Sequence, residues 1–254
     1  EKGRAKAEEK AKKAGKPWTA ADDAKALESE REKAAKKYKE PVAPDTEGLP
    51  ELPEGWCWAS VETLGRVQLG RQRAPKHHQG PNMRPYLRVA NVFENRISTE
   101  HVAQMNFDES DYHTYKLRTG DILLNEGQSL ELVGRAAIYR DEVPGACFQN
   151  TLVRFQAFEG LDREYALTVF NGYLRNGRFQ RIAQWTTNIA HLGADRFAKM
   201  AFPLPPAAEQ QRIVTTVARM LSAGEKMSQS TIAGVKRSSS LRQSILAAAF
   251  AGGL

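Results

Sequence analysis

The chain has 254 residues, of which 41% are hydrophobic and 26% charged, the composition of an ordinary soluble protein with one large domain or a medium domain plus an appendage. Its longest apolar run, Ile245 to Ala251, is far shorter than the ~20 residues of a membrane-spanning helix. The cysteines, Cys57 and Cys147, are too few for a disulfide framework or a CxxC-type zinc site, so we expect a cytoplasmic protein. The net charge is +7, yet residues 49–204 hold 18 Lys and Arg against 17 Asp and Glu, so any affinity for a polyanion there must come from local clustering.

Residues 1–41 are predicted to form a charged helical segment. They are rich in Lys, Ala and Glu and begin without methionine, as if the chain were entered midway. Thr19-Ala-Ala-Asp22 has the Ser/Thr-x-x-Asp/Glu form of a helix N-terminus, and helix formers follow it to about Lys39. The charges are more typical of a solvated helix face than of a nucleic-acid contact. Residues 42–52, which contain Pro44, Gly48 and Pro50, are predicted to be a linker.

Residues 53–204 are predicted to form a mixed α/β domain. Short strand-like runs alternate with turns, and one helix over residues 163–182 interrupts them with apolar side chains at helical spacing. We interpret that apolar stripe as core packing. The expected strands are Cys57 to Leu64, Tyr86 to Val92, Asp121 to Leu124, Val133 to Tyr139, Phe148 to Ala157 and Lys199 to Leu204.

Residues 205–254 are predicted to contain one long helix from Glu209 to about Phe250, ~60 Å long at 1.5 Å per residue. Prolines and an acid suit its first turn, and two glycines end it. So long a helix must pack on another long helix, and we expect an antiparallel, coiled-coil-like arrangement. The expected interface is the apolar seam at heptad spacing, formed by Ile213, Val217, Met220, Met227, Leu241 and Ile245.

The sequence carries little that predicts catalysis. It has neither a G-x-x-x-x-G-K-[ST] phosphate loop nor a G-x-G-x-x-G turn, and it lacks the Asn/Asp-Pro-Pro-aromatic tetrapeptide of amino-methyltransferases. The histidines are not spaced as helical metal ligands, so we expect no metal and no cofactor. Asp121 and Glu126 lack the lysine that a nuclease site would need, and Asp121 is better explained as a residue that stabilises a turn.

Basic and amide side chains remain as candidates for DNA contacts. The loop Gly70–Gly80, which we call the basic loop, suits phosphate binding and insertion of arginine into a groove, although a solvated surface loop explains it equally well. Amide-rich turns at Gln128-Ser129, Gln149-Asn150 and Gln184–Asn188 could read adenine edges, and each could also be an ordinary capped turn. The candidate DNA-contacting residues are Arg71, Arg73, Lys76, His77, His78, Arg88, Gln128, Gln184, Thr186, Thr187 and Asn188.

Several motifs together resemble the DNA-specificity subunit of type I restriction-modification systems. The resemblance covers residues 49–254, and its most specific part is Pro-Leu-Pro-Pro-x-x-Glu-Gln leading into a long helix. The motifs are Leu52-Pro-Glu-Gly-Trp56-x-Trp58, Tyr86-Leu-Arg-Val-Ala-Asn91-Val, Leu117-x-x-Gly120-Asp121-Ile-Leu, Val133-Gly134-Arg135, Asn188-Ile-x-His-Leu192, Pro203-Leu-Pro-Pro206-x-x-Glu209-Gln210-x-Arg212-Ile213-Val and Leu241-Arg-Gln-Ser-Ile245-Leu-x-x-Ala249-Phe250-x-Gly.

The resemblance implies a non-catalytic chain that binds double-stranded DNA and docks two partners, a methyltransferase subunit that modifies adenine and a motor-nuclease restriction subunit. Residues 53–204 would be one target-recognition domain, residues 205–254 a spacer and dimerisation helix, and residues 1–41 the tail of the central conserved region. Since the family's subunit carries two recognition domains, the chain looks like a C-terminal half that reads one half of a bipartite target. It would then be either a fragment or a naturally divided subunit, and a homodimer through the long helix would replace the missing half.

Two other functions remain open on the sequence alone. The chain could be the recognition domain of a fused restriction-methyltransferase with its catalytic part upstream, or a helical scaffold protein without a nucleic-acid role. The identity of the partners would distinguish the first alternative, and an absence of DNA binding would favour the second.

Overall fold

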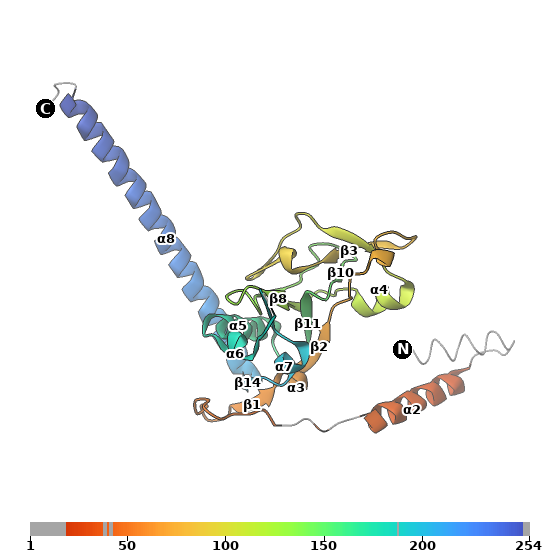
Figure 1. Cartoon of the computed structure of the whole chain (residues 1–254). Coiled ribbons are helices and arrows are strands. Elements are labelled where there is room, and N and C mark those ends of the chain that lie inside the picture. Colours follow the sequence, from red (N-terminus) through yellow and green to blue (C-terminus); the bar gives the residue numbers. More distant parts are fainter. Residues whose placement is uncertain (1–18, 38–39, 41–42, 187, 251–254) are drawn as a thin grey trace. The chain divides into compact units, whose positions relative to one another are not determined.

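The computed structural model describes residues 19–37, 40, 43–186 and 188–250, and the chain divides into two compact units at Val42 (Figure 1). In the first unit, helix α2 spans Ala20–Lys37. Its N-terminus is the predicted one: the Thr19 backbone N–H donates to Asp22 Oδ2 at 3.0 Å, and the Asp22 N–H donates to Thr19 Oγ1 at 3.3 Å. The two residues satisfy each other's free backbone donors, which explains why the helix begins there.

A four-stranded antiparallel sheet forms the centre of the second unit, in the order β2-β11-β7-β9. Its two faces are both buried, because Ile122 and Leu124 contribute to one apolar cluster while Leu123, between them, contributes to another. Burial on both faces explains why these three consecutive residues of one strand are all apolar. The strands are β2 (Gly65–Leu69), β7 (Ile122–Asn125), β9 (Ala136–Ile138) and β11 (Leu152–Ala157).

Smaller sheets surround this centre. The first strand, β1 (Cys57–Ser60), pairs antiparallel with β14 (Ala201–Leu204), so the start and the end of this part of the chain are joined. We call residues 53–204 the central domain. A second sheet has the order β10-β3-β6, and β4 pairs with β5. Their bounds are β3 (Met83–Leu87), β4 (Val92–Phe93), β5 (Arg96–Ile97), β6 (Ala103–Asn106) and β10 (Cys147–Phe148), with short helices η1 (Pro75–His77), η2 (Val89–Asn91), α4 (Glu109–Tyr115) and α7 (Ala194–Ala198) between strands.

Several sequence predictions need correction here, among them the strand expected over Phe148 to Ala157, which is two strands, β10 and β11, with residues 149–151 between them. The expected strand over residues 57–64 ends at Ser60, where the short helix α3 (Val61–Leu64) begins, and the strand expected to reach Val92 ends at Leu87. The single helix over residues 163–182 is two helices, α5 (Arg163–Arg175) and α6 (Arg178–Ile182). Gly177 separates them with φ of +78°, a left-handed conformation that glycine adopts without strain.

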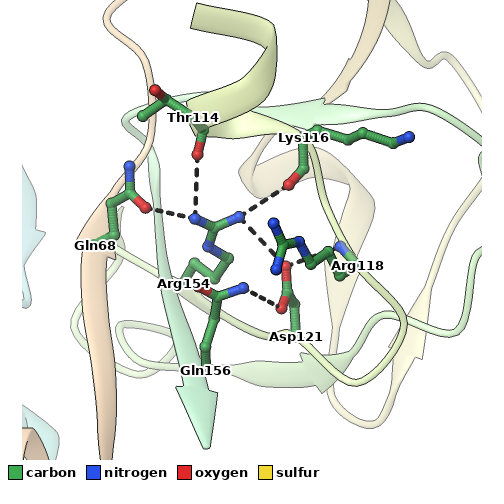
Figure 2. A network of polar contacts seen from close by, with 7 residues as sticks. All are labelled: Gln68, Thr114, Lys116, Arg118, Asp121, Arg154 and Gln156. Carbon is green, nitrogen blue, oxygen red and sulfur yellow. Dashed lines mark hydrogen bonds and ion pairs between the residues drawn. The ribbon is translucent and has the colours of Figure 1, made fainter. Parts of the chain in front are cut away.

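A buried polar network lies beside the central sheet (Figure 2). Arg154, on β11, forms an ion pair with Asp121 at 3.4 Å, and both side chains are about 4% exposed. Asp121 also accepts hydrogen bonds from the Arg118 backbone N–H at 3.0 Å and from Gln156 Nε2 at 2.8 Å. The prediction that Asp121 stabilises a turn is therefore confirmed by its bond to Arg118.

Helix α8 spans Ala207–Phe250, ~66 Å at 1.5 Å per residue, and Figure 1 shows it as one unbroken helix. Ile213 and Val214 pack against the core of the central domain, so Ile213, which was predicted to belong to the interface seam, contacts its own chain instead, and the exposed part of the seam begins after it. From Ala218 to Phe250 the described side chains are exposed, and the large apolar ones are Met220, Leu221, Met227, Ile232, Val235, Leu241, Ile245, Leu246 and Phe250. Among the residues that the structure describes, no helix has the length and apolar character needed to cross a membrane.

Candidate nucleic-acid interface

A small three-stranded sheet brings two of the predicted amide-rich turns together. Strands β12 (Gln184–Thr186) and β13 (Ile189–His191) form a hairpin, and β13 also pairs with β8 (Gly127–Gln128). Gln128 is thus placed opposite Ala190, although the two lie far apart in the sequence. We call the hairpin of β12 and β13 the β12–β13 ribbon.

The two faces of the ribbon differ in character. Because side chains alternate along a strand and opposed residues share a face, Gln184, Thr186, Ile189 and His191 all lie on one face. On the other face Ala190 is fully buried in the apolar core, and its two pairing partners, Gln128 of β8 and the exposed Trp185 of β12, share that face. The face with Gln184 is therefore the outward one, and it combines amide, hydroxyl, aliphatic and imidazole groups.

The ribbon is held by a set of polar contacts at its base. His191 Nδ1 lies 3.0 Å from Glu126 Oε2, and the Leu192 N–H donates to the Glu126 carbonyl at 2.8 Å. Arg196 donates to the His191 carbonyl at 2.7 Å and to Gln184 Oε1 at 3.3 Å. These bonds tie both strands of the ribbon to neighbouring elements, so its outward face is pre-organised.

Four predicted residues come together at this sheet. Gln128 is half-buried and accepts a hydrogen bond from the Ser129 N–H at 3.1 Å, whereas Gln184, Thr186 and Asn188 are exposed. Thr187 lies outside the described residues. Trp185, Ile189 and His191 also belong to the ribbon but were not among the candidates, because the sequence analysis predicted an amide-rich turn here and no hairpin.

Arg71 lies inside the domain, which differs from the expectation that it contacts DNA. Its guanidinium forms an ion pair with Asp111 at 2.5 Å, donates to the Asn106 carbonyl and stacks 4.8 Å from the centre of the Phe107 ring. These partners occupy the donors that a phosphate would need. Arg71 therefore anchors the start of the basic loop.

The rest of the basic loop is more accessible. Arg73, Lys76 and His78 are exposed, and His77 is half-buried with Nδ1 at 3.3 Å from Arg71 Nη2. Partial burial, with Arg71 and Lys76 nearby, lowers the pKa of His77 and so favours the neutral form of its ring. Arg73 and Lys76 are the loop's exposed permanent charges.

Two further candidates lie near this loop. Arg88 is half-buried, and its backbone N–H donates to Asn91 Oδ1 at 3.2 Å. Gln149 and Asn150 are half-buried, and their backbone N–H groups donate to the carbonyls of Leu87 and Arg71.

Among the described residues, no three His, Cys, Asp or Glu side chains are grouped so that they could hold a metal ion.

Comparison with known proteins identifies the family. Residues 59–232 match the family described as the type I restriction modification DNA specificity domain, and the chain belongs to this family. It is 24% identical over 172 residues to the type I restriction enzyme EcoKI specificity subunit of Escherichia coli (strain K12), covering 67% of this chain and 37% of that protein. It is 23% identical over 178 residues to the putative type I restriction enzyme MjaX specificity subunit of Methanocaldococcus jannaschii, covering 69% and 41%. The chain thus spans about two fifths of the length of these relatives.

Solved structures show the same mixed α/β fold with a long helix. The crystal structure of the HsdS subunit from Thermoanaerobacter tengcongensis superposes with a TM-score of 0.54 at 20% identity, over 82% of this chain and 48% of that one. A chain from a structure described for complex assembly and conformational transition of the type I R-M system gives a TM-score of 0.57 at 19% identity, over 91% and 55%. The expectation of a non-catalytic component agrees with the names of the relatives, each of which is a specificity subunit.

Proposed function

We propose that this chain binds double-stranded DNA sequence-specifically and reads one half of a bipartite target through the β12–β13 ribbon. The observation that carries the proposal is the outward face of that ribbon, where Gln184 and Thr186 lie on a pre-organised two-stranded element of a specificity-family chain. A two-stranded β-ribbon fits the major groove, and an amide can pair with adenine at two points. The proposal includes the cytoplasmic location expected from the sequence, because a protein that binds DNA must share a compartment with it.

The basic loop supplies the second contribution. Arg73 and Lys76 are exposed on a loop anchored by the buried Arg71, a geometry that suits phosphate contacts. Phosphate contacts fix register and orientation, whereas contacts to base edges discriminate sequence. The loop and the ribbon therefore have separate roles in the proposal, affinity for the first and specificity for the second.

Helix α8 is the proposed docking element for other subunits. Its exposed seam from Met220 to Ile245 is too apolar to remain uncovered in water. A second copy of this helix, packed antiparallel, or the methyltransferase subunit would cover it, and a motor-nuclease restriction subunit would join the same complex. The relatives are separate specificity subunits, which favours this arrangement over a module within a fused restriction-methyltransferase.

The test starts by selecting a preferred duplex from a random-sequence pool with the full chain, alone and with its methyltransferase partner. Gln184→Ala should then relax the preference at one base pair by about 1–3 kcal/mol while nonspecific binding persists. Gln211→Ala, which removes an exposed amide from α8, is the matched control and should leave the preference intact. A chain that selects no preferred sequence, with or without the partner, would contradict the proposal.

A further inference from the structure

We propose that Ile189 reads a thymine in the major groove by contact with the C5-methyl group of the base. This inference rests on the proposed function, because it assigns one specificity contact within the proposed DNA interface. It assigns a base-reading role to an aliphatic residue that belongs to the Asn188-Ile-x-His-Leu192 motif but was not among the candidate DNA contacts.

Exposure is the first observation. Ile189 is 47% exposed and Trp185 is 56% exposed, so two of the four large apolar side chains that are prominently exposed among the described residues of the central domain lie on this one short hairpin. The other two, Leu69 and Phe158, are on separate elements. Trp185 is paired with Ala190 and therefore lies on the opposite face of the ribbon, so Ile189 is the large exposed apolar side chain on the face that carries Gln184 and Thr186.

The strand register is the second observation. Thr186 is directly opposite Ile189, and Gln184 and His191 share that face at the next pair. Ala190, on the opposite face, is fully buried and fills the core position of this strand. Ile189 therefore does not serve the core, and its side chain belongs to the outward face.

The neighbouring strand leaves this face open. Gly127, on β8, is opposite His191, and a Cβ atom built there would lie 3.5 Å from both Ile189 Cγ2 and His191 Cε1. Since glycine has no side chain, nothing from β8 stands over Ile189 on that side. The outward face can then approach a groove closely.

The chemistry of an A·T pair matches this arrangement. In the major groove, adenine presents the N7 acceptor and the N6 amino donor, and thymine presents the O4 acceptor and the C5-methyl group. Gln184 can supply amide donors to adenine, and its Oε1 keeps a second lone pair beside the bond from Arg196. An amide and an aliphatic side chain on one face fit the two ends of this edge, the amide at N7 and N6 of adenine and the aliphatic group at the thymine methyl, whereas a G·C pair offers no methyl.

The experiment uses the full chain and the duplex that it selects from a random-sequence pool. Each thymine of that duplex is replaced in turn by deoxyuridine, which lacks only the C5-methyl group. For the unsubstituted chain, replacement at one position should weaken binding about four-fold, the effect of one buried methyl group. Ile189→Ala should bind the thymine and deoxyuridine duplexes equally, while Ile189→Val should keep most of the difference.

Phe158→Ala is the control, since it removes an exposed apolar residue from another element and should retain the sensitivity. The inference is overturned if the chain selects a defined sequence but Ile189→Ala remains as sensitive to deoxyuridine as the unsubstituted chain at every thymine. That result would leave the proposed function intact. It is also overturned if Ile189→Ala weakens binding equally on all duplexes, because that result indicates a structural role. If the unsubstituted chain selects no sequence at all, the proposed function fails first.

Discussion

Trp56 Nε1 donates a hydrogen bond to Glu209 Oε2 at 2.7 Å and so joins the start of the central domain to the first turn of α8. The next residue, Gln210, is buried and makes three further bonds: Oε1 accepts from the Asp162 N–H at 2.8 Å, and Nε2 donates to the carbonyls of Gly160 and Pro205, each at 3.2 Å. The Glu-Gln pair of the sequence motif is thus the joint that fixes how the long helix leaves the domain.

The first prediction concerns this joint. Gln210→Ala should lower the free energy of unfolding by about 2–3 kcal/mol, because it leaves a buried N–H and two carbonyls without their partner. Gln211→Ala, the same substitution one position later at an exposed site, should change it by less than about 0.5 kcal/mol. Urea unfolding followed by tryptophan fluorescence measures both. Equal changes in the free energy of unfolding for the two variants would show that the buried hydrogen bonds of Gln210 contribute little to stability.

The second prediction concerns the buried ion pair. Arg154→Met should destabilise the chain by about 3 kcal/mol, because it removes the ion-pair partner of the buried Asp121 side chain. Replacing both residues, as Asp121→Leu with Arg154→Met, should restore part of the loss, since no uncompensated charge then remains. The double-mutant cycle in urea measures this coupling. Purely additive losses would contradict it.

The third prediction separates the two kinds of arginine in the basic loop. Arg73→Ala with Lys76→Ala should weaken DNA binding and flatten the slope of log K against log salt by about one unit for each phosphate that is no longer neutralised, without changing stability. Arg71→Ala should instead lower the unfolding temperature, because Asp111 loses its buried partner. Arg31→Ala, an exposed site in α2, is the control for both readouts. An unchanged salt slope in the double variant would remove the loop from the interface.

The fourth prediction concerns assembly through α8. Met227→Glu with Leu241→Glu should prevent self-association or methyltransferase recruitment, since charges in an apolar seam remain unpaired on docking. Gln229→Glu with Ser240→Glu places the same charges roughly 140–160° around the helix from Met227, on its polar side, and should have little effect. Val217 is not substituted in this test, because it lines a pocket beside α5 and a charge there would also disturb contacts within the chain.

Analytical ultracentrifugation at tens of micromolar, with and without the methyltransferase, measures the outcome. A monomeric chain that keeps its full helix content and recruits no partner would contradict the role assigned to the seam.

Local chemistry determined several elements of this protein. The Thr19–Asp22 cap, the turn around Asp121 and the long helix that follows Pro205-Pro206 were all predicted from neighbouring residues, because each depends on contacts within a few positions of the chain. The family followed from motif order alone, and residues 59–232 match it.

Tertiary structure decided which polar residues are free to bind a ligand. Arg71 and Arg73 look alike in the sequence, but only Arg71 meets Asp111 and Phe107, which lie more than thirty residues away. Ile189 looks like a core residue, and only the pairing of β13 with β8 and β12 places it on the outward face while Ala190 fills the core. The physical reason is that burial of a side chain is set by strand pairings between distant segments, and a shift of one residue in register would have reversed the two faces.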